Sequence, residues 1–90
     1  MKTDFAKPFN NDVQKIANVV IVDEVKQAIL DVKKAQTLKS IPNLRKLKGY
    51  KAGIYFRIRV GRYRIGVTIV GDLVTFARCL PRKNFYQCFP

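Results

Sequence analysis

The arginines are the residues of this chain that are best suited to chemistry. All seven lie in the second half of the 90-residue sequence, at Arg45, Arg57, Arg59, Arg62, Arg64, Arg78 and Arg82. A guanidinium group stays charged at any working pH and binds phosphate through two parallel hydrogen bonds. Residues 44–90 hold eleven basic side chains and one acid, whereas residues 1–43 hold seven lysines and five acids. This segregation predicts that the second half faces a polyanion, and a generally basic surface is the alternative.

The residue types that are missing exclude several familiar kinds of enzyme. The chain has no histidine, which is the usual general base near neutral pH and a common zinc ligand. Cys79 and Cys88 are nine positions apart, a spacing that fits neither a Cys-x-x-Cys redox pair nor a four-ligand zinc site. We therefore expect two free, partly buried thiols, no metal and no cofactor.

Length and hydropathy predict one small domain that spans residues 1–90. With 48% hydrophobic residues the sequence is too apolar for a disordered basic tail, and its length supports one modest core. The longest apolar run, Val19–Val22, is far shorter than the ~18–20 residues that cross a bilayer. The first residues form no hydrophobic signal core, so we expect a cytoplasmic protein.

The first half predicts a short strand followed by two helices. Lys2–Phe5 has the length of a strand, and apolar residues then recur at helical spacing over 9–20 and over 25–35. We assign Val19–Val22 to the end of the first helix and a tight connection. Asp23 and Glu24 would then lie in the opening turn of the second helix, where acids suit the helix dipole. The segment around Pro42 is expected to be an irregular or short helical linker.

The second half predicts three antiparallel strands. From Ile54 the hydrophobic period changes to two, and turns are expected at Gly61-Arg62 and Gly71-Asp72. The element order is then β-α-α-β-β-β and the fold class is α+β. Two N-terminal helices would pack on one face of a small antiparallel sheet and leave its other face free.

A two-residue turn at Gly61-Arg62 sets the register of the first hairpin. It pairs Ile58 with Ile65 on one face and Arg59 with Arg64 on the other. Because like charges directly opposite each other destabilise a sheet, this arginine pair favours a phosphate bound between them. Arginines that merely keep an exposed face soluble are the alternative.

Two further positions bear on this face. Gly66 falls opposite Arg57 and leaves space where the backbone of a ligand could approach. The same turn logic at Gly71-Asp72 directs Arg78 toward the apolar face. Either a β-bulge turns Arg78 outward, or it lies at the edge of the core beside an acid such as Asp31.

Three segments of the second half form a recognisable set. They are KLKG at 46–49, YFRIRVGRYRI at 55–65 and RCLPRKNFY at 78–86. Together with the two preceding helices, they resemble the RelE/ParE superfamily of toxins from bacterial toxin–antitoxin systems over nearly the whole chain. The resemblance implies a RelE-like toxin that docks into the ribosomal decoding site and cuts messenger RNA. It also implies a cognate acidic antitoxin that covers the basic surface.

The resemblance assigns roles to individual residues. Arg57 and Arg59 match the basic strand residues, and Arg64 matches the phosphate-binding arginine of the next strand. Arg82 and Tyr86 match the C-terminal basic residue and tyrosine. Many relatives carry a histidine immediately before the position of Arg82, where this chain has a proline, and many end in a longer C-terminal helix.

RNA can be cut without a metal because its own 2′-OH attacks the adjacent phosphorus. The protein then has to stabilise the extra negative charge on the phosphate and transfer two protons. Fixed cations suit the first task, and we expect it to fall to Arg59, Arg64 and Arg82. Without histidine, the candidates for proton transfer are Tyr86 and Lys83. Packing of Tyr86 on the neighbouring phenylalanines is the alternative.

The remaining candidates are expected to bind RNA without reacting with it. They are Arg57, Lys46, Lys48, Lys51, Arg78 and Lys83. For the three loop lysines, solvated charges are the alternative interpretation. Two other functions stay open for the whole chain: a ParE-like inhibitor of DNA gyrase without nuclease activity, and a non-catalytic basic module that binds RNA.

Overall fold

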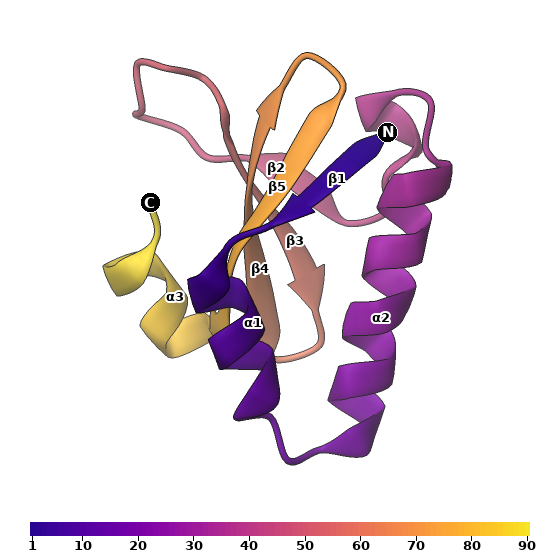
Figure 1. Cartoon of the computed structure of the whole chain (residues 1–90). Helices are drawn as coiled ribbons and strands as arrows, with labels where there is room; N and C mark the ends of the chain where they lie inside the picture. The colour runs from indigo at the N-terminus through magenta and orange to yellow at the C-terminus, as the bar shows by residue number, and fades with distance from the viewer.

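The computed structural model describes residues 1–90 and confirms the α+β class (Figure 1). A five-stranded sheet of order β1-β5-β4-β3-β2 forms its centre. The strands are β1 (Lys2–Phe5), β2 (Leu44–Lys46), β3 (Tyr55–Val60), β4 (Tyr63–Val70) and β5 (Leu73–Pro81). The helices are α1 (Lys7–Gln14), α2 (Val19–Lys34), the short 3-10 helix η1 (Leu38–Ser40) and α3 (Arg82–Cys88).

The boundary between α1 and α2 differs from the prediction. The Asn18 side chain caps α2 by accepting hydrogen bonds from two backbone N–H groups of its first turn, at 2.9 and 3.3 Å. The assignment of Val19–Val22 to the end of the first helix and a connection is wrong, because an asparagine cap starts a new helix there. Asp23 and Glu24 therefore lie beyond the opening turn of α2.

The sheet is mixed, and it is wider than the expected antiparallel meander. β1 runs parallel to β5, whereas the other three strand pairs are antiparallel. Part of the segment expected to be a linker forms β2, which pairs with β3 at the sheet edge. Three residues are too few for an alternating pattern to be visible in the sequence, which explains why this strand was missed.

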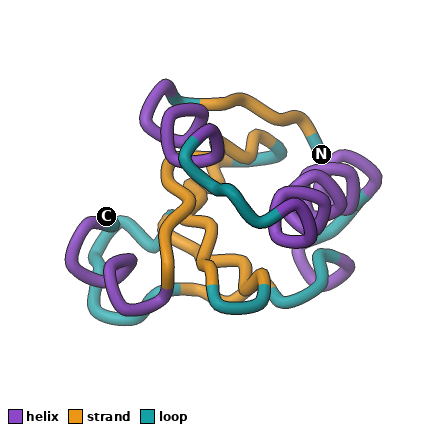
Figure 2. The backbone as a smooth tube through the Cα atoms, turned by 90° about the horizontal axis from the view of Figure 1, so that it is seen from below, coloured by secondary structure: helices purple, strands orange, loops and turns teal.

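Helices α1 and α2 cover one face of the sheet and enclose the main core (Figure 2). Phe9 of α1 and Val25 and Val32 of α2 are buried against inward-facing strand residues. The fully buried strand residues include Ile58, Ile65, Val67, Val74 and Phe76. Burial of side chains of this size contributes about 1.5–3 kcal/mol each, so this layer holds the hairpin in place.

The predicted register of the hairpin is confirmed residue by residue. Arg59 pairs with Arg64 and Ile58 pairs with Ile65 across the turn. In the next pair of strands, Gly66 lies opposite Arg78 and Val67 lies opposite Phe76. One residue of β5, Ala77, is thus left over as a β-bulge, which turns the side chain of Arg78 away from the apolar face.

The other face of the sheet is not free, because α3 packs on it. Phe85 of this helix and Phe89, which follows its last residue, are buried, and their rings stack at 5.4 Å between centroids. A Cβ atom at Gly66 would lie 2.7 Å from the ring of Phe89. The space at Gly66 therefore accommodates the protein's own phenylalanine rather than the backbone of a ligand, which corrects the prediction.

Gly66→Ala is expected to destabilise the fold by roughly 1–3 kcal/mol, because the new methyl group overlaps the Phe89 ring. Urea denaturation followed by circular dichroism measures this loss. In the Gly66→Ala/Phe89→Ala double variant the three atoms that the methyl group would overlap, Cγ, Cδ1 and Cδ2 of Phe89, are absent. The double variant should therefore lose less than the sum of the two single losses, and strictly additive losses would contradict the proposed packing.

Candidate functional site

Arginines gather on the face of the sheet that carries α3. Cross-strand pairing places Arg45 beside Arg57 and Arg59 beside Arg64, all on the side away from α1 and α2. Only one cationic side chain of the protein, that of Arg78, lies within ion-pair distance of an acid. The other arginines of this face are therefore not neutralised by carboxylates within the chain.

A hollow of about 840 Å³ lies where this face meets the start of α3. Its lining consists of Gly61, Arg62, Tyr63, Arg64, Pro81, Arg82, Lys83 and Tyr86. Four of these residues are cations and none is acidic. The structure therefore brings together Arg64, Arg82, Lys83 and Tyr86, which the sequence singled out from two separate segments. We call this space the Tyr86 hollow.

The Arg64 side chain is held by the turn between β3 and β4. Its Nη1 donates hydrogen bonds to the carbonyl oxygens of Gly61 and Tyr63, both at 2.9 Å. Its Nε is buried and is the one such side-chain atom of the molecule without a hydrogen-bond partner. A buried orphan donor is costly in a stable fold and is a frequent feature of functional groups. The turn thus fixes this guanidinium before any ligand arrives.

Tyr86 combines a packed ring with an accessible hydroxyl. The ring makes an edge contact with buried Phe85 at 5.0 Å between centroids, yet 53% of the residue is exposed. Packing against Phe85 is therefore present, as the alternative interpretation held, and it fixes the ring of a residue that still lines the hollow.

Arg57 links Tyr86 to the other arginines electrostatically. Burial lowers the pKa of Arg57, and the positive charges of Arg64 and Arg45 act in the same direction. The nearby phenol of Tyr86 acts in the opposite direction and raises it. Tyr86, Arg64 and Arg45 therefore all lie close enough to influence Arg57, although Arg57 does not line the Tyr86 hollow.

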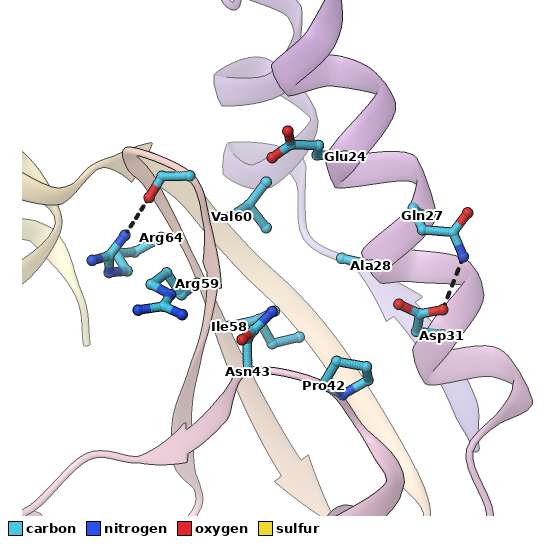
Figure 3. A pocket seen from close by; sticks show the side chains of 11 residues that line it. Glu24, Gln27, Ala28, Asp31, Pro42, Asn43, Ile58, Arg59, Val60 and Arg64 are labelled. Atoms are coloured by element: carbon cyan, nitrogen blue, oxygen red, sulfur yellow. Dashed lines mark hydrogen bonds between the residues drawn. The ribbon is translucent and has the colours of Figure 1, made fainter.

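Arg59, one of the predicted catalytic residues, does not line the Tyr86 hollow. It lines a cleft of about 610 Å³ between α2 and the β3–β4 hairpin, together with Arg64. In Figure 3, Glu24 and Asp31 on α2 lie across this cleft from the two arginines. No ion pair spans the cleft, and Asp31 instead accepts a hydrogen bond from Gln27 at 2.9 Å.

The predicted RNA-binding lysines do not form one group. Lys46 and Lys48 line a hollow next to β2, whereas Lys83 lines the Tyr86 hollow. Lys51 is exposed in the loop before β3 and lines none of these spaces. Sequence reasoning missed Arg45, because it treated the three residues of β2 as part of a linker.

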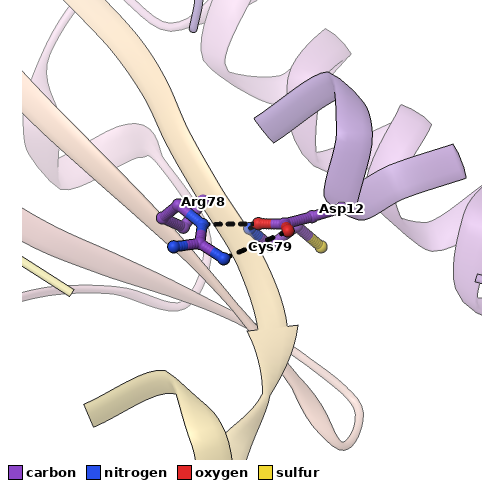
Figure 4. Close-up of polar contacts among 3 residues, drawn as sticks. All are labelled: Asp12, Arg78 and Cys79. Atoms are coloured by element: carbon purple, nitrogen blue, oxygen red, sulfur yellow. Dashed lines mark hydrogen bonds and ion pairs between the residues drawn. The ribbon is translucent and has the colours of Figure 1, made fainter. Parts of the chain in front are cut away.

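Arg78 lies at the edge of the core, where it is held by Asp12 (Figure 4). Its Nε and Nη2 donate to the two carboxylate oxygens of Asp12 at 2.8 and 3.2 Å. The same carboxylate accepts the backbone N–H of Cys79 at 3.0 Å. Both the β-bulge and an acidic partner are thus present, and the acid is Asp12 of α1 rather than Asp31. This arginine is committed to an internal ion pair.

Both cysteines are free, but only Cys79 is buried; Cys88 is exposed. Burial raises the pKa of Cys79 to about 12, and the negative charge of Asp12 adds to the effect. Because the thiolate is the reactive form, Cys79 should be inert in the folded protein. No cluster of three or more acidic or sulfur-bearing side chains that could hold a metal ion is present.

Alkylation with iodoacetamide near pH 8 is therefore expected to modify Cys88 alone in the native protein and both thiols after denaturation. Mass spectrometry counts the added groups. The Cys88→Ser variant is the matched control, and it should stay unmodified until it unfolds. Rapid modification of this variant under native conditions would contradict the described packing of Cys79 against Asp12.

Known proteins resemble this chain in both sequence and fold. No family model matches the sequence. A curated relative, Toxin RelE3 of Methanocaldococcus jannaschii, is 38% identical over the full length of both chains. No helix of the present chain is both long and apolar enough to cross a membrane.

Solved structures show the same fold. A RelB–RelE antitoxin–toxin complex from Methanococcus jannaschii contains a chain that superposes with a TM-score of 0.79 at 37% identity, covering 97% of this chain and 99% of that one. The YoeB dimer of Staphylococcus aureus superposes with a TM-score of 0.71 at 17% identity, covering 89% of this chain and 94% of that one. The full-length similarity to Toxin RelE3 shows that the chain belongs to the RelE family of toxins.

Proposed function

We propose that this RelE-family chain is a ribosome-dependent endoribonuclease that cleaves messenger RNA and thereby stops translation. The observation that carries the proposal is the Tyr86 hollow, where three arginines, a lysine and two tyrosines converge without an acid among them. Such a lining attracts a phosphodiester and offers groups that can stabilise charge and move protons.

The reaction needs no bound metal or cofactor in this mechanism. The 2′-oxygen forms a bond to the adjacent phosphorus while the bond from phosphorus to the 5′-oxygen breaks. The 2′-hydroxyl gives up one proton and the leaving 5′-oxygen takes one up. Arg64 and Arg82 supply positive charge where the phosphate gains negative charge in the transition state.

Tyr86 is the group that we assign to proton transfer. Its phenol lies close to Arg57, and the packed ring holds it in place at the hollow. The β5 strand ends in Pro81, so no side chain at that position can assist. General acid–base catalysis by Tyr86 would then supply the usual factor of ~10²–10⁴ in rate.

The openness of the Tyr86 hollow supports dependence on the ribosome. It borders only one end of β4, the end of β5 and the first turns of α3, so nothing encloses a nucleotide on its outer side. Alignment of a 2′-oxygen with phosphorus is a large part of the catalytic advantage. We assign that alignment to the ribosome, which would hold the message while the hollow contacts it.

A cognate acidic antitoxin is the proposed physiological partner. Solved relatives are toxins in complex with RelB antitoxins from Methanococcus jannaschii and Pyrococcus horikoshii. The present chain has a net charge of +12, and most of it lies in residues 44–90. Acidic side chains on an antitoxin would neutralise this surface and exclude RNA from the hollow.

Arg64→Ala is expected to lower message cleavage by roughly 10²–10³-fold, by analogy with the loss of one fixed donor to a developing negative charge. Wild type and variant are induced in bacteria, and primer extension on a translated message detects new ends. Arg64→Lys should recover little of the lost cleavage. An ammonium group lacks the planar set of donors through which the turn carbonyl oxygens hold the Arg64 guanidinium in place. Full cleavage by Arg64→Lys would contradict this role of the fixed guanidinium. A wild type that causes neither new message ends nor growth arrest would favour the non-catalytic RNA-binding module.

Tyr86→Phe separates chemistry from packing, because it keeps the ring contact with Phe85 and removes only the hydroxyl. We expect a loss of roughly 10²–10⁴-fold in cleavage with unchanged thermal stability. Thr3→Val is the matched control, because it removes a hydroxyl from β1, outside the hollows, and it should cleave like wild type. Growth arrest without new message ends but with DNA damage signalling would contradict the nuclease and favour a gyrase inhibitor.

A further inference from the structure

A second basic hollow lies beside β2, on the side of the Arg59–Arg64 pair that is remote from α3. Its volume is about 830 Å³, and its lining consists of Asn43, Leu44, Arg45, Lys46, Lys48, Arg57 and Arg59. Five of these residues are cations and none is acidic. Arg45 belongs to neither the Tyr86 hollow nor the cleft beside α2.

Arg45 and Arg57 face each other across neighbouring strands. They are direct partners in the antiparallel pairing of β2 with β3, which places their Cα atoms about 4.5–5.5 Å apart. Like charges in this arrangement cost stability. No acid of the chain relieves the cost, because the only ion pair joins Arg78 to Asp12. An anion between the two guanidinium groups would relieve it.

Asn43 holds Arg57, one member of this pair, at the rim of the hollow. Its backbone has a φ of 62°, a left-handed conformation that asparagine tolerates better than most residues. In this conformation its carbonyl oxygen accepts hydrogen bonds from Nη1 of Arg57 at 3.1 Å and from the backbone N–H of Arg59 at 3.3 Å. Arg57 is thus oriented by the main chain, as Arg64 is by the turn carbonyls.

We propose that this second hollow is a phosphate site in which Arg45 and Arg57 bind a backbone phosphate of the RNA, distinct from the phosphate held by Arg64 and Arg82. The inference rests on the proposed function and extends it. The RNA strand would cross the sheet from α3 toward β2, passing the Arg59–Arg64 pair. Arg45 would then anchor the substrate without taking part in the chemistry.

An aromatic row beside the arginines favours nucleic acid over an acidic peptide as the occupant. Ring contacts at 5.0–5.9 Å between centroids connect Tyr50, Tyr55, Phe89, Phe85 and Tyr86 in turn. The two end members, Tyr50 and Tyr86, are exposed. Exposed rings next to phosphate-binding cations are typical of surfaces that bind single-stranded nucleic acid, where bases stack on aromatic side chains.

Binding of uncleavable oligonucleotides tests the second site without relying on cleavage. The probes are a fluorescein-labelled deoxyuridine dinucleotide and decanucleotide, measured by anisotropy over a range of salt concentrations. Arg45→Ala should weaken binding of the decanucleotide and reduce the slope of log K against log salt by about 0.7, the value for one phosphate contact to a single strand. Binding of the dinucleotide should not change. Lys26→Ala, on exposed α2 across the molecule, is the matched control and should bind both probes like wild type.

Three outcomes would overturn the inference. They are an unchanged salt slope in Arg45→Ala, equal affinity of wild type for the two probes, or a loss restricted to the binding of a polyglutamate peptide. None of them affects the Tyr86 hollow. Failure of the proposed function would appear separately, as the absence of message cleavage by wild type.

Discussion

Cross-strand pairing of β3 with β4 puts hydrophobic side chains on one face of the sheet and arginines on the other. Ile58 and Ile65 are buried beneath α2, while Arg59 and Arg64 are opposed on the outer face. A slip of one residue would exchange the faces and bury guanidinium groups, so the register is strongly specified. Every site on this molecule depends on that single alignment.

The alignment brings like charges together, and the fold compensates for their repulsion in several ways. Burial of the inward-facing residues outweighs an unfavourable cross-strand arginine pair, which costs less than about 1 kcal/mol. Backbone carbonyl oxygens, from Asn43 on one side and Gly61 and Tyr63 on the other, accept hydrogen bonds from Arg57 and Arg64. These neutral acceptors orient the guanidinium groups without cancelling their charge, which leaves the positive potential available to a polyanion.

Asp12 shows the contrasting case, in which a cation is neutralised. Helix α1 follows β1 directly along the chain. The buried carboxylate of Asp12 on this helix accepts the backbone N–H of Cys79, just beyond the last residue of β5 that pairs with β1. Arg78 completes this arrangement through a two-point ion pair. The ion pair closes the edge of the sheet, and this arginine is unlike the others in having an acidic partner.

Period-two hydrophobicity and a short turn were enough to predict the hairpin and its register. The resemblance to RelE/ParE toxins, and not this periodicity, predicted that Arg64, Arg82 and Tyr86 belong together. The features that the sequence did not reveal depend on tertiary contacts. The three-residue strand β2 is too short to show an alternating pattern in the sequence. Arg45 lies in this strand, so it was not predicted to be a site residue. Phe89 packs over Gly66, and no local sequence pattern predicts a contact between residues so far apart in the chain. The space at Gly66 was therefore predicted to accommodate the backbone of a ligand.

The ends of the cleaved RNA test the central claim, metal-free attack by the 2′-hydroxyl, most directly. Purified protein is added to ribosomes programmed with a message that carries a single 2′-deoxy substitution at the mapped cleavage position, with the unmodified message as control. The mechanism predicts 5′-hydroxyl ends on the control message and no cleavage at the substituted position. Cleavage that persists at the 2′-deoxy position, or that leaves 5′-phosphate ends, would contradict it.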